Sequence, residues 1–283
     1  MTESAYMREE YLQASLEYLR DATQLIFDLS GNHLQGRDEK LFIPLASCCN
    51  TAVGIYKLLY GSTDTEREAY MLMRALLERI VNLNYLRVAD DLEVEKYFMH
   101  ATYRMYHMTV RQQVGSKGTA VVKLNSDSRK RLYSDPEIQK ALDLFSHTKP
   151  GLDWTDLSIS KRIRYIGEKR SIKEEAFLIA SLITYADASE VLHGSHYGDM
   201  FLTGIYAFGT YETTPTRQEV NHHISVSLGM PIVMLAQLLV ATARVIAADH
   251  ELDKYVETAK KLDKQAAPIL RRMLSTGPQE QND

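Results

Sequence analysis

The sequence predicts an all-α protein, a single multi-helix bundle of eight or nine helices. Apolar residues recur at the spacing of one helix face along almost the whole chain. The connections between these periodic segments are short, and no linker or internal repeat divides the chain. One run rich in β-branched residues, within 114–128, is too short to build a sheet. Helices joined by short connections bury their apolar stripes against one another, which is the architecture of a bundle.

Length and composition set the expected domain organisation. The chain has 283 residues, 45% of them apolar, with only 7 Pro and 14 Gly, which excludes a disordered or fibrous protein. We predict one helical domain over 1–283, with a core over about 3–274 and a loose tail over 275–283. The formal net charge of −4 excludes a strong bulk attraction to nucleic acid or to an anionic membrane.

The first half of the chain contains four predicted helices. The first covers 3–29, where leucine and isoleucine residues form one apolar stripe opposite charged residues. The second covers 38–60, and we expect a kink at Pro44 because proline disrupts a helix interior. A capping-box pattern opens the third helix, 63–88, and the fourth, 91–113, is rich in Tyr, Met and His.

Helical periodicity resumes after the irregular stretch that begins at 114. Asp135 and Pro136 start a helix that extends to His147, because proline suits the first turn of a helix. Capping-box patterns also open two of the later helices. These helices cover 158–169, 172–193, 216–249 and 251–274, and a long ordered loop is expected over 194–215.

The N-terminus and the cysteines indicate the compartment. The first residues are polar and acidic with no apolar run, so no signal peptide is predicted. The most apolar stretch, 231–248, is interrupted by polar residues, so we expect a buried or interface helix rather than a membrane span. Cys48 and Cys49 are adjacent within an apolar segment and are expected to be buried as small hydrophobic residues. We predict a cytoplasmic protein without a membrane partner.

A polar stripe follows one face of the third predicted helix. Apolar residues occupy most positions over 71–83, so this helix is expected to be buried around most of its circumference. Arg67, Arg74, Glu78 and Asn82 are spaced seven, four and four apart and therefore fall on one narrow line. One interpretation is an intrahelical Arg74–Glu78 ion pair that fixes the packing. The other is a polar pocket in which Glu78 acts as acid, base or ligand and Arg74 binds an anion.

A second group of polar residues gathers near position 193. Asp187, Glu190 and His193 approach one face at the end of their predicted helix, and the segment HGSH continues into the loop. A histidine at a helix C-terminus is favoured by the helix dipole alone, which is the structural interpretation of His193. The functional interpretation is a metal or catalytic site, because this is the densest group of such residues in the chain.

These two segments together resemble a bacterial, all-helical domain family of unknown function. The family pattern is Arg-x-x-x-Glu on an early helix and Ser-x-x-x-His-Gly at a later helix end. The matching residues here are Arg74, Glu78, Ser189 and His193, and the resemblance spans roughly 40–250. It supplies no biochemistry, but it implies that the four residues gather at one place.

A more distant resemblance is to HEPN-type ribonucleases, whose marker is Arg, four to six residues, then His on a helix. Arg217 with His222 or His223 has this spacing, and so does Arg244 with His250, although a chain with nine histidines gives such matches by chance. In such an enzyme the histidine moves protons at the ribose 2′-hydroxyl and the arginine stabilises charge on the phosphate.

A carboxylate-bridged dimetal site is an alternative. That chemistry uses Glu-x-x-His from each of two helices and further glutamates from two more. Glu190-x-x-His193 and Glu219-x-x-His222 both match, with Glu78 as a third carboxylate. Glu219 is also explained as a capping-box partner, so the sequence leaves this alternative open.

A non-enzymatic sensor or scaffold module is the third class, with the apolar helix from Pro231 as a helix–helix interface in a homo-oligomer. Phosphate-loop, dinucleotide, CxxC and GxSxG motifs are absent from the sequence, and we predict no cofactor. Our leading hypothesis is metal-independent RNA cleavage in a defence or toxin setting, based on Arg217 and His222. A polar pocket is expected from Arg74, Glu78 and His193, with Ser189 and Asp187 behind them.

Overall fold

The computed structural model of this chain describes most of the backbone. The described ranges are 3–32, 34–60, 65–110, 112–114, 120–122, 133–147, 153–169, 172–193 and 217–275. They divide into two compact units, one formed by Met1–Arg87 with Arg162–Asp283 and the other by Val88–Lys161. The prediction of one domain over 1–283 is not tested by this division and stays a prediction.

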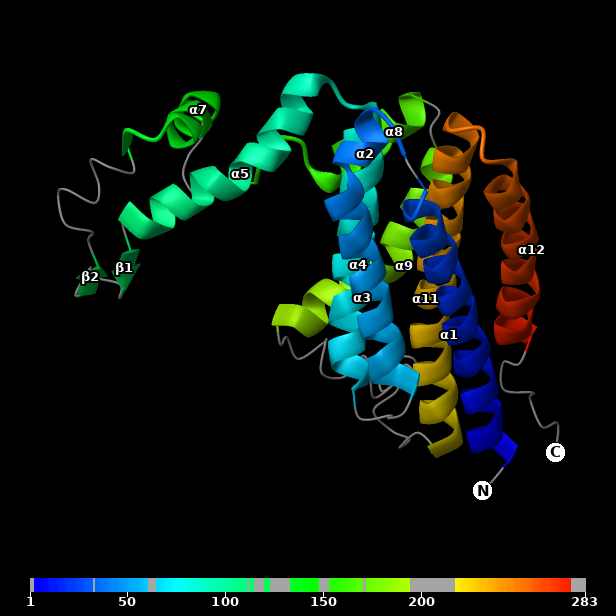
Figure 1. The fold of residues 1–283 in the computed structure, drawn as a ribbon. Helices are drawn as coiled ribbons and strands as arrows, with labels where there is room; N and C mark the ends of the chain where they lie inside the picture. The colour runs from blue at the N-terminus through cyan, green and yellow to red at the C-terminus, as the bar shows by residue number, and fades with distance from the viewer. Residues whose placement is uncertain are drawn as a thin grey trace. The chain divides into compact units, whose positions relative to one another are not determined.

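The predicted all-α class is confirmed (Figure 1). The described residues form ten helices, whereas eight or nine were predicted, and the expected helix 38–60 is two helices. The helices of the first unit are α1 (Glu3–Ser30), α2 (Arg37–Lys40), α3 (Phe42–Tyr60), α4 (Glu66–Val88), α8 (Ile159–Glu168), α9 (Glu174–His193), α11 (Arg217–Asp249) and α12 (Asp253–Ser275). The last residue of α4 and the first three of α8 belong to the second unit.

The long helix α11 is at the centre of the first unit. α1 packs against α3, α11 and α12, and α11 also packs against α9 and α12 (Figure 1). Most of its apolar side chains are buried within this one chain: Leu228, Ile232, Val233, Leu235, Ala236, Leu238, Leu239, Val240, Ala243, Ile246 and Ala247. Burial inside the bundle therefore explains this apolar helix without a second copy, and homo-oligomerisation stays a prediction.

Two helices of the described chain are long and apolar enough to cross a membrane by length and composition. They are α3 and the part of α11 over His223–Asp249, and 61% of the window in α11 is buried inside the protein. Core helices of bundles share this composition. Cys48 and Cys49 on α3 are buried as predicted, and burial raises the pKa of both thiols, that of Cys49 to about 11.

The kink expected at Pro44 is not where the helix is interrupted. The chain breaks at Leu41, between α2 and α3, and Pro44 lies in the first turn of α3. A backbone N–H in the first turn has no intrahelical acceptor, so proline loses nothing there. The prediction treated Pro44 as an interior residue because the apolar pattern continues through the break.

The second unit is built on α5 (Asp91–Val110) and α7 (Pro136–Leu144). α5 is shorter than the predicted 91–113, because Gln112–Val114 forms β1, which pairs antiparallel with β2 (Ala120–Val122). The run expected to be too short for a sheet thus contributes to a two-stranded hairpin. α7 begins at Pro136, in agreement with the predicted start, and the carboxylate of Asp135 before it accepts from two backbone N–H groups.

An aromatic core holds α5 and α7 together. Tyr103 on α5 and Phe145 after α7 are buried, with ring centroids 4.7 Å apart. His107 contacts Tyr103 edge-on at 4.5 Å, and His100 lies 5.6 Å from Phe145. Both histidines therefore pack against this core.

Acid is expected to weaken this second unit through His107. Burial, together with the charge of Arg104, lowers the pKa of His107 below its ordinary value of 6.5. Its contribution to stability is therefore complete above pH 6.5 and is lost as the pH falls through the lowered pKa. Urea unfolding at pH 7.5 and pH 5, followed by fluorescence of Trp154, should show a smaller pH dependence for His107→Gln than for the natural chain. The exposed His147 gives the control, His147→Gln; equal pH dependence in all three proteins would contradict the assignment.

Candidate functional site

The helix that the sequence predicted to be buried on most sides is α4. Eleven of its residues are buried: Ala69, Tyr70, Met73, Leu76, Leu77, Ile80, Val81, Leu83, Asn84, Tyr85 and Leu86. Two of the hydrogen bonds that connect α4 to its neighbours come from buried side chains. The Tyr70 hydroxyl donates to the Ile183 carbonyl of α9 at 3.2 Å, and the Asn84 amide donates to the Thr242 hydroxyl of α11 at 2.9 Å. Polar side chains on α4 are thus held at fixed positions within the bundle.

Arg74 is the centre of a three-residue polar group on α4 and α9. Its Nε donates to the Glu78 carboxylate at 3.1 Å, which forms the predicted i, i+4 ion pair. Its Nη2 donates to the Tyr185 hydroxyl at 3.0 Å, and its guanidinium carbon lies 4.3 Å from the centre of the Tyr185 ring. The ion pair of the structural interpretation is therefore present, and a tyrosine from α9 extends it.

One nitrogen of this guanidinium is left over. The Arg74 side chain is 17% exposed, and its Nη1 is buried without a hydrogen-bond partner among the described residues. A buried donor without an acceptor costs about 1–3 kcal/mol, so such positions are rare in proteins. Glu78 is 36% exposed, so a ligand from solvent can reach its carboxylate. The arrangement offers a positive N–H donor and a carboxylate base one turn apart on α4, with a phenol from α9 beside them.

The remaining polar residues of the stripe separate from this group. Asn82 accepts a hydrogen bond from Arg162 of α8, whose side chain is buried, and Arg67 is exposed near the start of α4. The polar residues of the stripe thus contact different helices: Arg74 contacts α9 and Asn82 contacts α8.

His193 lies at the end of α9, eight residues beyond Tyr185. In a regular helix this is about 12 Å along the axis and about 80° around it. The side chain is exposed, that of Ser189 is half-buried, and no hydrogen bond or ion pair within the described ranges joins His193 to Arg74 or Glu78. A shared pocket that contains Arg74, Glu78 and His193 stays a prediction. The loop expected over 194–215 lies outside the described residues.

The family comparison covers this site. The family described as a family of unknown function, DUF5677, matches residues 41–201. The chain belongs to this family. The match includes Arg74 and Glu78 on α4 and all of α9, so the predicted resemblance to a family of unknown function is confirmed. It ends before α11, whereas the resemblance was expected to reach about residue 250. No curated protein and no solved structure matches this DUF5677 chain.

In the Arg244–His250 pair, which also has HEPN-type spacing, each side chain contacts a different residue. Arg244 forms an ion pair with Asp263 of α12 at 3.8 Å, whereas His250 contacts the Asp38 carboxylate at 3.1 Å. Arg217, Glu219 and His222 are in the first turns of α11, and their side chains lie outside the described residues. The dimetal hypothesis needs Glu219 and His222, so it stays a prediction. Among the described side chains, no three His, Cys, Asp or Glu residues are grouped so as to hold a metal ion.

A second charged group in this DUF5677 protein was not predicted from the sequence. Arg87 binds Asp38 through two nitrogens at 2.8 and 3.1 Å and Asp249 at 2.6 Å, and His250 joins through Asp38. Arg87 and Asp38 are 6% and 10% exposed. These residues connect α2, α4 and the end of α11, and only the tertiary fold brings them together. Tyr185 was missed for a related reason, because its partner is 111 positions away.

Thr184, next to Tyr185, provides a stability test. Thr184 is fully buried, and its hydroxyl has no hydrogen-bond partner within the described part of the chain. Thr184→Val is expected to raise the free energy of unfolding by about 1 kcal/mol, because it removes an unsatisfied buried hydroxyl. Thr242→Val is the matched control and should lower it by about 1–2 kcal/mol, because Thr242 donates to Leu238 and accepts from Asn84. Urea unfolding measures both; a loss of stability in Thr184→Val would contradict the expectation.

Proposed function

We propose that this DUF5677 protein cleaves RNA without a metal ion, with Arg74, Glu78 and Tyr185 as the reacting groups. One observation carries the proposal: the buried Nη1 of Arg74 lacks an acceptor among the described residues and lies beside a carboxylate and a phenol. A phosphate oxygen is an acceptor that would satisfy this donor and its charge together. Arginine is well suited to this role because its planar N–H groups match phosphate geometry.

The three side chains can supply each part of a transphosphorylation. The Glu78 carboxylate takes the proton of a ribose 2′-hydroxyl, and the 2′-oxygen attacks the adjacent phosphorus. Arg74 stabilises the negative charge that develops on the phosphate oxygens. The bond from phosphorus to the 5′-oxygen breaks, and the leaving oxygen takes the Tyr185 hydroxyl proton. The Tyr185 oxygen then carries a negative charge next to Arg74, and both protons are exchanged with solvent after release.

The defence or toxin setting belongs to the same proposal and comes from the HEPN analogy. If it holds, expression of the natural chain in bacteria stops growth, whereas expression of an inactive variant does not. The fold alone is a poor guide to function, so the assay on purified protein decides.

The test is cleavage of total cellular RNA in excess EDTA by purified protein. Wild type should cleave, and Arg74→Lys, Glu78→Gln and Tyr185→Phe should each be much slower. Glu95→Gln is the matched control, because Glu95 of α5 also forms an ion pair, with Lys140 at 2.5 Å, and is 38% exposed, close to the 36% of Glu78. Loss of cleavage with His222→Ala but not with Glu78→Gln would transfer the site to α11 and overturn this assignment. No cleavage by clean wild-type protein would overturn the enzyme proposal in favour of a binding module.

A further inference from the structure

The outer face of α12 is basic in a chain whose net charge is negative. Over Asp253–Ser275 there are six basic and three acidic residues, although the whole chain has a formal charge of −4. The opposite face of α12 is apolar and is buried in the bundle through Ala259, Leu262, Ala266 and Met273. This helix lies outside the residues that match DUF5677.

Three of the basic side chains are available for an anion. Lys261, Lys264 and Arg271 are exposed and form no ion pair within the described part of the chain. Ten residues of helix separate the first and last of them, which is about 15 Å along the axis. A row of this length can contact successive phosphates of an extended strand.

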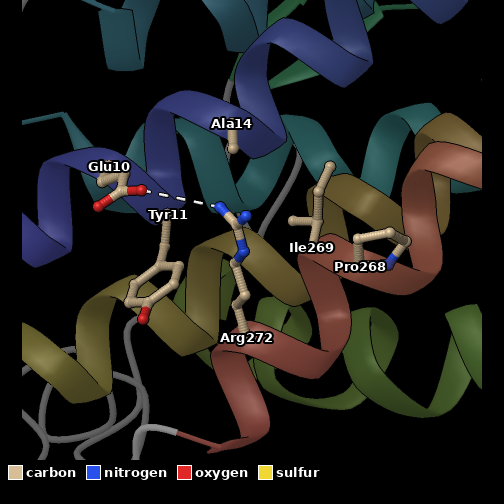
Figure 2. Close-up of a pocket in the computed structure, with 6 residues that line it drawn as sticks. All are labelled: Glu10, Tyr11, Ala14, Pro268, Ile269 and Arg272. Carbon is tan, nitrogen blue, oxygen red and sulfur yellow. Dashed lines mark ion pairs between the residues drawn. The ribbon is translucent and has the colours of Figure 1, made fainter.

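A small pocket adjoins this row between α12 and α1 (Figure 2). Its volume is about 150 Å³, and it is lined by Glu10, Tyr11, Ala14, Pro268, Ile269 and Arg272. In Figure 2 the Arg272 side chain extends from α12 toward α1 and passes between Tyr11 and Ile269. Its contact with Glu10 is long, at 3.8 Å, and both side chains are more than half exposed, so the ion pair is weak.

We propose that the outer face of α12 and this pocket bind single-stranded RNA, with phosphates on Lys261, Lys264 and Arg271 and a base against Tyr11. This inference rests on the proposed function, because it supplies the substrate with a second contact away from the α4–α9 site. Proteins that bind single strands combine a row of basic residues with an aromatic side chain on which a base stacks. The outer face of α12 and the adjoining pocket have both. An anionic membrane is the less favoured partner, because the apolar face of α12 is buried in the bundle.

Glu10 opposes the binding of RNA at the pocket. Its carboxylate repels phosphate and competes for Arg272. Glu10→Gln is therefore expected to tighten RNA binding, whereas Tyr11→Ala should weaken it about tenfold through the loss of stacking. Tyr11→Ala changes no charge, so a general effect of charge would not weaken RNA binding in this variant. Tighter binding in Glu10→Gln and weaker binding in Tyr11→Ala would therefore indicate a specific pocket.

The experiment is anisotropy of a fluorescent single-stranded 20-nucleotide RNA at several salt concentrations, with Glu78→Gln protein in EDTA to prevent cleavage. Neutralisation of the three basic residues, Lys261→Gln, Lys264→Gln and Arg271→Gln, should reduce the slope of log K against log salt by about 2. The matched control neutralises three exposed lysines elsewhere, Lys40→Gln, Lys57→Gln and Lys173→Gln, and should leave the slope unchanged.

Each outcome decides the proposal. A reduced slope in the α12 variant alone supports it. Equal slopes, no RNA binding, or binding to phosphatidylserine vesicles without binding to RNA overturns it. Cleavage of a dinucleotide, measured in the α12 variant without Glu78→Gln, should equal that of wild type. That assay reports on the α4–α9 site alone, so failure of one proposal is distinguishable from failure of the other.

Discussion

Glu78→Gln is expected to slow RNA cleavage by roughly 100- to 10,000-fold, the contribution of a positioned general base. Arg74 Nε donates to the Glu78 carboxylate at 3.1 Å. Glutamine has the same size and keeps an acceptor for this hydrogen bond, but it cannot take a proton near neutral pH. Single-turnover cleavage of a labelled RNA measures the effect. Circular dichroism and urea unfolding should show a folded protein, because Glu78 is 36% exposed.

The pH profile separates a base from a merely structural carboxylate. If Glu78 is the base, the acidic limb of the rate profile is lost in Glu78→Gln, and the residual rate changes little over that range. Retention of the acidic limb, or a rate within threefold of wild type, would contradict the assignment. Glu95→Gln should match wild type in both respects.

The largest effect on stability is expected from Arg87→Met. Arg87 is 6% exposed and pairs with Asp38, which is 10% exposed, and with Asp249. Removal of the arginine leaves the Asp38 carboxylate buried without its cation, which typically costs about 3–5 kcal/mol. Urea unfolding at pH 7.5 measures the loss.

The exposed pair of Arg20 and Asp21 provides the control. These side chains are 55% and 40% exposed, and pairs of this kind contribute about 0–1 kcal/mol. Arg20→Met should therefore change stability little. A loss in Arg87→Met no larger than in this control would show that the buried group does not support the fold.

Most of the fold could be predicted because helical periodicity and capping residues are local signals. The ends of α1, α8, α9 and α12 agree with the sequence-based ranges to within two residues. The break at Leu41 was missed because apolar residues continue across it. The β1–β2 hairpin was missed because three-residue strands carry too few alternating positions to show a period.

The site was predictable only in part, for a related reason. The Arg74–Glu78 pair is visible in the sequence because its partners are four positions apart on one helix. Tyr185 and the group around Arg87 depend on contacts between distant segments, and no local pattern encodes them. The proposed cleavage assay would distinguish the roles assigned to Arg74, Glu78 and Tyr185 from the alternatives on α11.

The central position of α11 has a consequence for synthesis on the ribosome. α1 packs against α11 and α12, yet about 190 residues separate the end of α1 from the start of α11. Synthesis proceeds at about 5–20 residues per second, so on the order of 10–40 s pass between the completion of α1 and the start of α11. Such long-range contacts slow folding, and the nascent chain exposes apolar helices during that time. Folding of this protein in the cell is therefore expected to depend on chaperones that bind the emerging N-terminal helices until α11 is complete.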